Sequence, residues 1–159
     1  MLNTVSQTVE SLRLKMDQTA STLPECPVVM GMNGVSSSLG PQLMAKIEDV
    51  TRFTHREALT AFARVDTGKN DSGKRNQKSV RTSKKGSTSL RKTLFQIMDG
   101  LIKCSPVGDP VYAFMDKKRS EGKPYYVYMT AGANKFLRIY YEWVLAYLAS
   151  QEKSKESWF

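Results

Sequence analysis

Residues 125–149 read YYVYMTAGANKFLRIYYEWVLAYLA, and this stretch decides the fold that the sequence predicts. Its apolar and aromatic side chains recur at spacings of three and four, which is the period of an amphipathic helix. The predicted stripe comprises Val127, Tyr128, Ala131, Lys135, Arg138, Tyr141, Val144 and Leu148, widened by Phe136, Leu137 and Tyr140. We therefore predict one long helix over residues 125–149.

Three shorter helices are predicted before this long one. Thr54 and Glu57 form a T-x-x-E capping box that predicts the start of a helix ending at Phe62. Residues 89–103 and 109–120 each place apolar side chains on one face. Those side chains are Leu90, Leu94, Ile97, Met98 and Leu101 in the first segment, and Val111, Tyr112, Phe114 and Met115 in the second. The sequence therefore predicts an all-α fold containing a helical bundle.

The first 22 residues predict a coiled-coil-like helix. Its apolar residues follow the alternating three- and four-residue spacing of a heptad repeat. They are Leu2, Val5, Val9, Leu12 and Met16. So short a stripe is unstable alone, so we expect it either to pack on the domain or to end a longer helix.

Residues 28–47 predict a helix-hairpin-helix-like unit: a short apolar piece, a turn containing Gly34, and an amphipathic helix. Pro41 is tolerated only in a first helical turn, so that helix is expected to start near Ser37 or Ser38. Such hairpins offer turn amides and a helix N-terminus to a phosphate, although most glycine turns only connect two helices. We predict three regions: the helix 1–22, a domain 23–149 and a polar tail 150–159.

Most of the positive charge lies in residues 64–92. This stretch holds ten Lys or Arg and two Asp, or +8 of the net +9 of the whole chain. It is rich in Gly, Ser and Asn, which predicts a long loop. So dense a local charge favours a polyanionic partner, and nucleic acid is the leading candidate.

The composition argues against several other classes of protein. No apolar run approaches the roughly 20 residues of a membrane span. Cys26 and Cys104 lie far apart and the chain has one histidine, which excludes a zinc finger and most catalytic triads. This cysteine usage favours a reducing cytoplasm. The chain also lacks a glycine-rich phosphate loop and the paired carboxylates of a metal nuclease.

Ser72 is the remaining candidate for chemistry. It is followed by Gly73 and lies close in sequence to Lys69, Lys74 and Arg75. A serine can attack a phosphodiester where cations hold the phosphate and stabilise the developing charge. From the residues alone, an ordinary Asp-Ser-Gly turn is the stronger interpretation.

Several motifs together resemble the C-terminal domain of the insertion-sequence 110/116/902 transposases, in order over roughly residues 28–148. The match is carried by segments 34–35, 39–45, 49–53, 59–62, 72–73, 83–86, 90–94, 116–123 and 134–141. An ordered series of motifs is more specific than any one of them.

The resemblance implies a serine nucleophile at Ser72 that forms a covalent phosphoserine link to DNA, guided by an RNA that the element encodes. Family members resemble one another in having an N-terminal RNase H-like domain with four metal-binding carboxylates and a coiled-coil linker. Residues 1–22 would then be the end of that coiled coil. The implied DNA contacts are Lys69, Lys74, Arg75, Lys78, Arg81, Lys84, Lys85, Arg91 and Lys92, with Gly34 and Ser36 in the hairpin turn.

The sequence departs from the family pattern in two ways. It contains no RNase H-like domain, so a divalent metal such as Mg²⁺ is expected only with that absent domain, and the chain is expected to be inactive alone. Ser36, Lys46, Glu48 and Arg64 also differ from the usual residues. Glu48 and Arg64 replace glycines of turns or helix ends, where we expect backbone strain.

Three functional hypotheses remain open at this point. The first is a DNA-binding transposase domain that bears Ser72 but lacks the metal half of the site. The second is a stand-alone nucleic-acid-binding or interaction module, forming a homo-oligomer or joining full-length transposase through the heptad stripe. The third is a decayed element fragment with no function, which predicts weak DNA binding that is insensitive to changes in residues 69–92.

Overall fold

The computed structural model describes residues 1–65 and 86–158, and all regular structure in these two ranges is helical, with no strand. The elements are α1 (Leu2–Ser21), α2 (Cys26–Met30), α3 (Leu39–Ile47), the 3₁₀ turn η1 (Val50–Arg52), α4 (Arg56–Phe62), α5 (Thr88–Cys104), α6 (Pro110–Ser120) and α7 (Tyr125–Glu156). The predicted all-α fold is confirmed.

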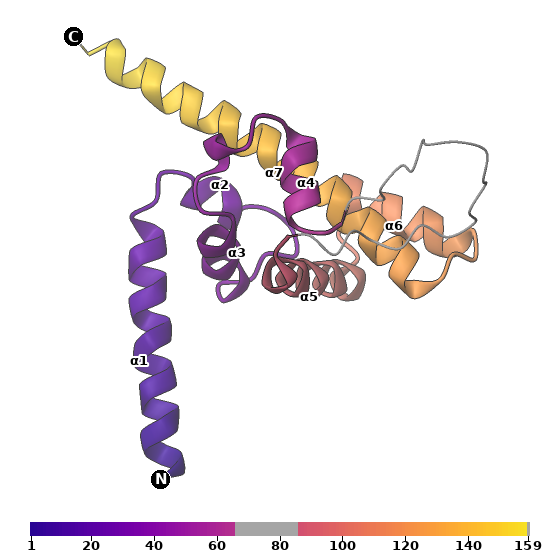
Figure 1. Ribbon diagram of the computed structural model, residues 1–159, viewed down its shortest axis with the longest axis horizontal. Helices are drawn as coiled ribbons and strands as arrows, with labels where there is room; N and C mark the ends of the chain where they lie inside the picture. The colour runs from indigo at the N-terminus through magenta and orange to yellow at the C-terminus, as the bar shows by residue number, and fades with distance from the viewer. Residues whose placement is uncertain (66–85, 159) are drawn as a thin grey trace.

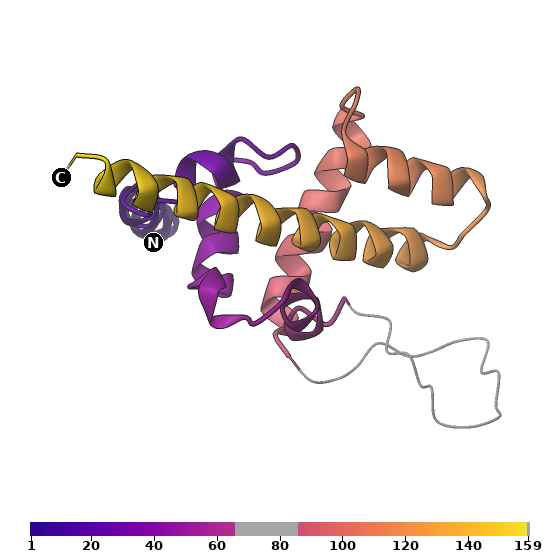
Figure 2. The same cartoon turned by 90° about the horizontal axis from the view of Figure 1, so that it is seen from above.

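Helix α7 is the spine of the molecule. It contacts α2, α4, α5 and α6, and Figures 1 and 2 show it crossing the body with α6 beside its first half. Its buried residues are Met129, Gly132, Ala133, Phe136, Leu137, Tyr140, Tyr141 and Val144. At Gly132 a Cβ would lie 2.4 Å from Met115 Sδ, so α6 can approach closely only because this residue lacks a side chain.

The buried face of α7 is rotated from the predicted stripe. Phe136, Leu137 and Tyr140, predicted only to widen the stripe, form its buried centre. Lys135 and Arg138, predicted within the stripe, instead line a hollow on the other side of the helix. The prediction was wrong here because a three-and-four spacing also runs along the neighbouring face, and only packing against α5 and α6 selects between the faces.

Side-chain caps set the starts of α5 and α6 close to the predicted ones. Ser87 Oγ accepts a hydrogen bond from Leu90 N at the start of α5, and Asp109 Oδ1 accepts from Val111 N and Tyr112 N at the start of α6. Helix α3 begins directly after Ser38, which places Pro41 in its first turn as expected.

Two boundaries differ from their predictions. The N-cap of α4 is His55, whose Nδ1 accepts a hydrogen bond from Ala58 N at 3.1 Å, so the predicted Thr54 capping box is wrong. The predicted polar tail 150–159 is helical as far as Glu156, since α7 continues through it.

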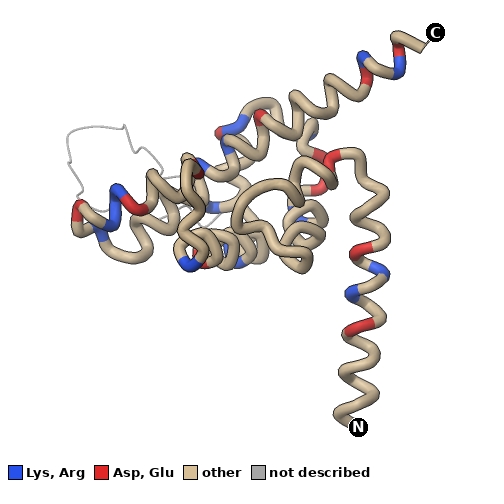
Figure 3. Tube along the Cα trace, turned by 180° about the vertical axis from the view of Figure 1, so that it is seen from behind, with Lys and Arg blue, Asp and Glu red and all other residues tan. Residues whose placement is uncertain are grey.

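Helix α1 stands apart from the body. Figure 1 shows it projecting from α2 and α3, and Figure 3 shows its charged residues on this separate helix. Only Ala20 is buried, whereas Val5 and Leu12 of the predicted stripe are 59% and 60% exposed. The helix is confirmed, and its apolar stripe does not pack on the domain.

Strain at the two substituted glycine positions is confirmed. Glu48 has φ 61° at the end of α3, and Arg64 has φ 58° after α4. Both angles lie in the region that side chains with a Cβ adopt only at a cost.

Candidate nucleic-acid interface

Val65 and Ser87 lie on either side of the segment 66–85 in the sequence, and both contact the end of α4. Val65 N donates to Thr60 O at 3.1 Å, and Asn134 Nδ2 of α7 donates to Val65 O at 3.3 Å. On the returning side, Ser87 N donates to Phe62 O at 2.7 Å. These bonds hold Val65 against α4 and α7, and Ser87 against α4.

Gly86 makes the close return possible. Its φ is 117°, and a Cβ there would lie 2.2 Å from Phe62 O. Any side chain at this position would therefore meet the backbone of α4 and adopt a disfavoured conformation. The Ser-Lys-Lys-Gly motif of residues 83–86 thus ends on a glycine that the fold requires.

Most of the predicted site residues lie outside the described residues. These are Ser72 and the basic residues Lys69, Lys74, Arg75, Lys78, Arg81, Lys84 and Lys85. Arg91 and Lys92 lie in the first turns of α5, whereas Gly34 and Ser36 lie in the turn between α2 and α3. The structure therefore describes four of the predicted positions, in two separate places.

Gly34 and Ser36 each have a structural explanation. A Cβ on Gly34 would lie 2.7 Å from Leu101 Cγ and 2.9 Å from Ile97 O, so this turn packs its backbone directly on α5. Ser36 Oγ accepts a hydrogen bond from Leu39 N at 3.2 Å as α3 begins. Nucleic-acid binding by these two residues stays a prediction.

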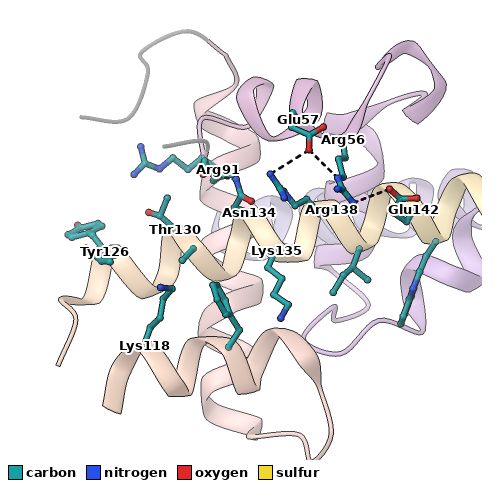
Figure 4. A pocket seen from close by; sticks show the side chains of 16 residues that line it. Arg56, Glu57, Arg91, Lys118, Tyr126, Thr130, Asn134, Lys135, Arg138 and Glu142 are labelled. Carbon is teal, nitrogen blue, oxygen red and sulfur yellow. Dashed lines mark hydrogen bonds and ion pairs between the residues drawn. The ribbon is translucent and has the colours of Figure 1, made fainter. Parts of the chain in front are cut away.

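A hollow of about 1480 Å³ lies along the face of α7 between α4 and α6. Figure 4 shows the side chains that line it. Val65 is among them, so the segment 66–85 begins at the wall of this hollow. Both ends of the hollow contain basic side chains, but the two ends differ in what those side chains contact.

One end, which we call the paired end, contains Arg56, Glu57, Arg138 and Glu142. Glu57 Oε1 lies 3.1 Å from Arg56 Nε and 3.5 Å from Arg138 Nη2, and Arg56 Nη1 lies 3.5 Å from Glu142 Oε1 (Figure 4). A hydrogen bond from its own backbone amide, followed by the bond from Arg56, lowers the pKa of Glu57. Two cations and two carboxylates therefore cancel.

The other end, which we call the open end, contains Arg91, Lys118, Tyr126 and Lys135 from α5, α6 and α7. The Nζ atoms of Lys118 and Lys135 lie 5.0 Å and 4.8 Å from the centre of the Phe114 ring. None of these three cations takes part in an ion pair with a described residue. Their positive charge is therefore uncancelled within that part of the chain.

A second hollow, of about 550 Å³, continues from the open end. It shares Arg91 and Tyr126 with the first and adds Lys92, Tyr125 and Asp99, whose carboxylate is paired with Lys103 at 2.6 Å. Lys46 lies close by, where its Nζ donates to Thr93 Oγ1 at 2.5 Å. Burial, followed by repulsion from Lys92, lowers the pKa of Lys46. The predicted pair Arg91 and Lys92 thus belongs to a continuous basic and aromatic surface.

Comparison with known proteins assigns the chain to a family. The model of the transposase IS116/IS110/IS902 family matches residues 26–113, which is more than half of the sequence. The chain belongs to this transposase family. No curated protein sequence matches it. The matched range runs from the first residue of α2 into α6, and it includes the whole segment 66–85.

In this transposase-family chain, the sequence analysis missed Lys118 and Lys135 as members of the hollow. Lys118 lies in the segment 116–123 that carries the family resemblance, but it was not named as a nucleic-acid contact. Lys135 was assigned to the buried stripe of α7. If the buried stripe had been predicted on the neighbouring face of α7, Lys135 would have been placed outside the core. It would then lie beside Lys118, on the surface that α6 and α7 share.

Metal-binding groups and membrane-spanning helices were considered among the described residues of this transposase-family chain. Outside the segment 66–85 and the last residue, no three His, Cys, Asp or Glu side chains form a group that could hold a metal ion. Among the helices described, none has the length and apolar character needed to cross a membrane.

Proposed function

We propose that this chain is the DNA-binding, serine-bearing part of a transposase, and that Ser72 is its nucleophile for strand exchange. The observation that carries the proposal is the family match, because it spans the entire basic segment in which Ser72 lies. The hydrogen bonds at Val65 and Ser87 support it, since they attach that segment beside an uncancelled basic surface.

In the proposed reaction, Ser72 Oγ attacks the phosphorus of a phosphodiester. The new Oγ–P bond forms as the bond from phosphorus to the leaving sugar oxygen breaks, and that oxygen takes up a proton while Oγ loses one. Lys74 and Arg75 would stabilise the charge that develops on the phosphate oxygens. Metal ions held by an RNase H-like domain on another chain would supply Lewis-acid assistance. An RNA encoded by the element would direct the domain to its target.

The direct test is a search for a covalent protein–DNA adduct after the chain is mixed with a partner that carries the RNase H-like domain. We expect an adduct that is lost in Ser72→Ala and retained in Ser79→Ala, a matched serine of the same basic segment. An adduct that survives Ser72→Ala would overturn the nucleophile assignment.

A second function is favoured by the exposed stripe of α1. Val5, Val9 and Leu12 are exposed on a helix that leaves the body, so they are free to pair with another helix. The chain would then associate with itself or with full-length transposase. Co-purification should be abolished by polar substitution of these three residues and unaffected by substitution of the polar Ser6, Glu10 and Arg13. Association that is unaffected by the apolar changes would exclude this role.

A further inference from the structure

We propose that the open end of the hollow binds single-stranded DNA, with phosphates on Lys118, Lys135 and Arg91 and a base stacked on Tyr126. The inference rests on the proposed function, and it goes further by naming the form of DNA and the residues that bind it. None of these residues lies in the segment 66–85.

The cations of the open end are complementary to a phosphate backbone. Lys118 and Lys135 both direct their ammonium groups to the Phe114 ring, so two like charges lie in one small region of the hollow, where a bound anion would lower their mutual repulsion. Across the whole hollow, five Lys or Arg side chains face two carboxylates, which leaves a net positive charge. That excess lies at the open end, because both carboxylates pair with arginines at the other.

Tyr126 supplies an exposed aromatic surface beside these cations. The residue is 68% exposed, yet its ring is held by two neighbours. It lies edge-on to Tyr125, with ring centres 5.6 Å apart, and tilted against Phe95 at 6.4 Å. A held, exposed ring among cations is the usual platform on which the bases of single strands stack.

The shape and charge of the hollow favour one strand over a duplex. At the open end Figure 4 shows the small side chain of Thr130 between Arg91 and Lys118, and Ala131 also lines the hollow. A duplex keeps its bases stacked inside, so it offers none to Tyr126. Toward the paired end, Arg56 and Arg138 are already paired with Glu57 and Glu142, so they offer phosphates no net attraction. The strand would therefore leave in the other direction, over Arg91 and Lys92 into the second hollow. We assign DNA because the proposed reaction acts on a DNA phosphodiester, and the test below compares it with RNA.

The test compares binding of fluorescent oligothymidylate, the same strand in a duplex, and oligouridylate by the full chain. Tyr126→Ala should weaken oligothymidylate binding roughly 5- to 150-fold, the loss expected for one stacked base, and leave duplex binding unchanged. Tyr126→Phe should restore the affinity. Lys118→Ala with Lys135→Ala should lower the salt slope by about 1.4, which corresponds to two lost single-strand phosphate contacts.

Matched controls come from the far end of α7. Lys153→Ala with Lys155→Ala removes the same charge, and Trp158→Ala removes an aromatic residue that is 88% exposed, so neither should change binding. Melting temperatures should be unchanged in all of these variants, because the substituted side chains lie at the surface.

Several outcomes would overturn the inference. Equal losses for single strand and duplex in Tyr126→Ala, no loss at all, or tighter binding of oligouridylate than of oligothymidylate would each do so. If substitutions in residues 69–85 weaken duplex binding while the open-end variants behave as the unmodified chain, the proposed function stands and this inference fails. If the unmodified chain binds no nucleic acid, both fail.

Discussion

The two ends of the hollow along α7 contain similar numbers of basic side chains, but the electrostatic potential differs between them. At the paired end, Arg56 and Arg138 contact Glu57 and Glu142, so their charges are cancelled. At the open end, Lys118 and Lys135 contact the face of Phe114, and no described carboxylate cancels their charges. The comparison shows that the number of cations does not define an anion-binding surface, because the partners of those cations decide the local potential.

Charge reversal at each end should give the largest effect. We expect Lys118→Glu with Lys135→Glu to weaken nucleic-acid binding about 100-fold or more, because like charges placed against phosphates cost several kcal/mol. Arg56→Glu with Arg138→Glu at the paired end should have a smaller effect. Fluorescence anisotropy at fixed salt measures both. Equal losses at the two ends would remove the distinction between them.

Substitution of Gly86 should have the next largest effect, and it tests how the chain is attached beside the hollow. Gly86→Ala places a Cβ 2.2 Å from Phe62 O at φ 117°, so we expect the free energy of unfolding to fall by about 3 kcal/mol. Urea denaturation gives this value.

Gly122→Ala is the matched control, because Gly122 has φ 76° and open space around its Cβ position. It should lose only the about 1 to 2 kcal/mol of a left-handed residue. Similar losses in the two variants would mean that the contact with α4 contributes nothing.

Replacement of Arg64, which precedes Val65, a residue that lines the hollow, should increase the free energy of unfolding by a smaller amount. Arg64→Gly relieves a φ of 58° and removes a buried Nε that has no hydrogen-bond partner among the described residues. The relief exceeds the entropic cost of glycine, so thermal denaturation should show a gain of about 0.5 to 1 kcal/mol. Ala146→Gly, in the middle of α7, should instead lose about 1 kcal/mol. A loss of stability in Arg64→Gly would show that its conformation is not strained.

Loss of the Glu57 charge should have the smallest effect. The folded-state pKa of Glu57 is lowered below 4.5, so its contribution to stability is present above that pH and is lost as the pH falls through the folded-state pKa. Glu57→Gln should therefore reduce the acid dependence of stability. It should also free Arg138, while Arg56 stays paired with Glu142, and strengthen nucleic-acid binding a few-fold. Acid titrations of the unmodified chain and of Glu57→Gln, followed by circular dichroism, should differ only as the pH falls below 4.5 and through the folded-state pKa of Glu57. Identical curves would contradict the ion-pair account.

Local signals in the sequence predicted most of the secondary structure. The starts of α3, α5 and α6 were predicted within a residue or two, because Pro41 restricts where α3 can begin, and Ser87 and Asp109 accept hydrogen bonds from the first amides of α5 and α6. The buried face of α7 was only partly predicted, since its rotation depends on α5 and α6. His55 was not expected as a cap, because histidine is an uncommon N-cap residue.

The candidate site could be predicted from the sequence only in part. Arg91 and Lys92 were found because they end a run of basic residues. Lys118 and Lys135 were missed because their relation is tertiary: α6 and α7 bring them together at Phe114. The family resemblance led to the prediction of strain at Glu48 and Arg64, which composition and periodicity could not show. The match over residues 26–113 now supports that resemblance.

The salt dependence of nucleic-acid binding by the unmodified chain tests most directly the central claim that its cations bind a phosphate backbone. If six to ten phosphates are contacted, the affinity should fall roughly 10³- to 10⁵-fold between 50 and 200 mM salt, with log K linear in log salt. An affinity that does not change over this range would contradict the account.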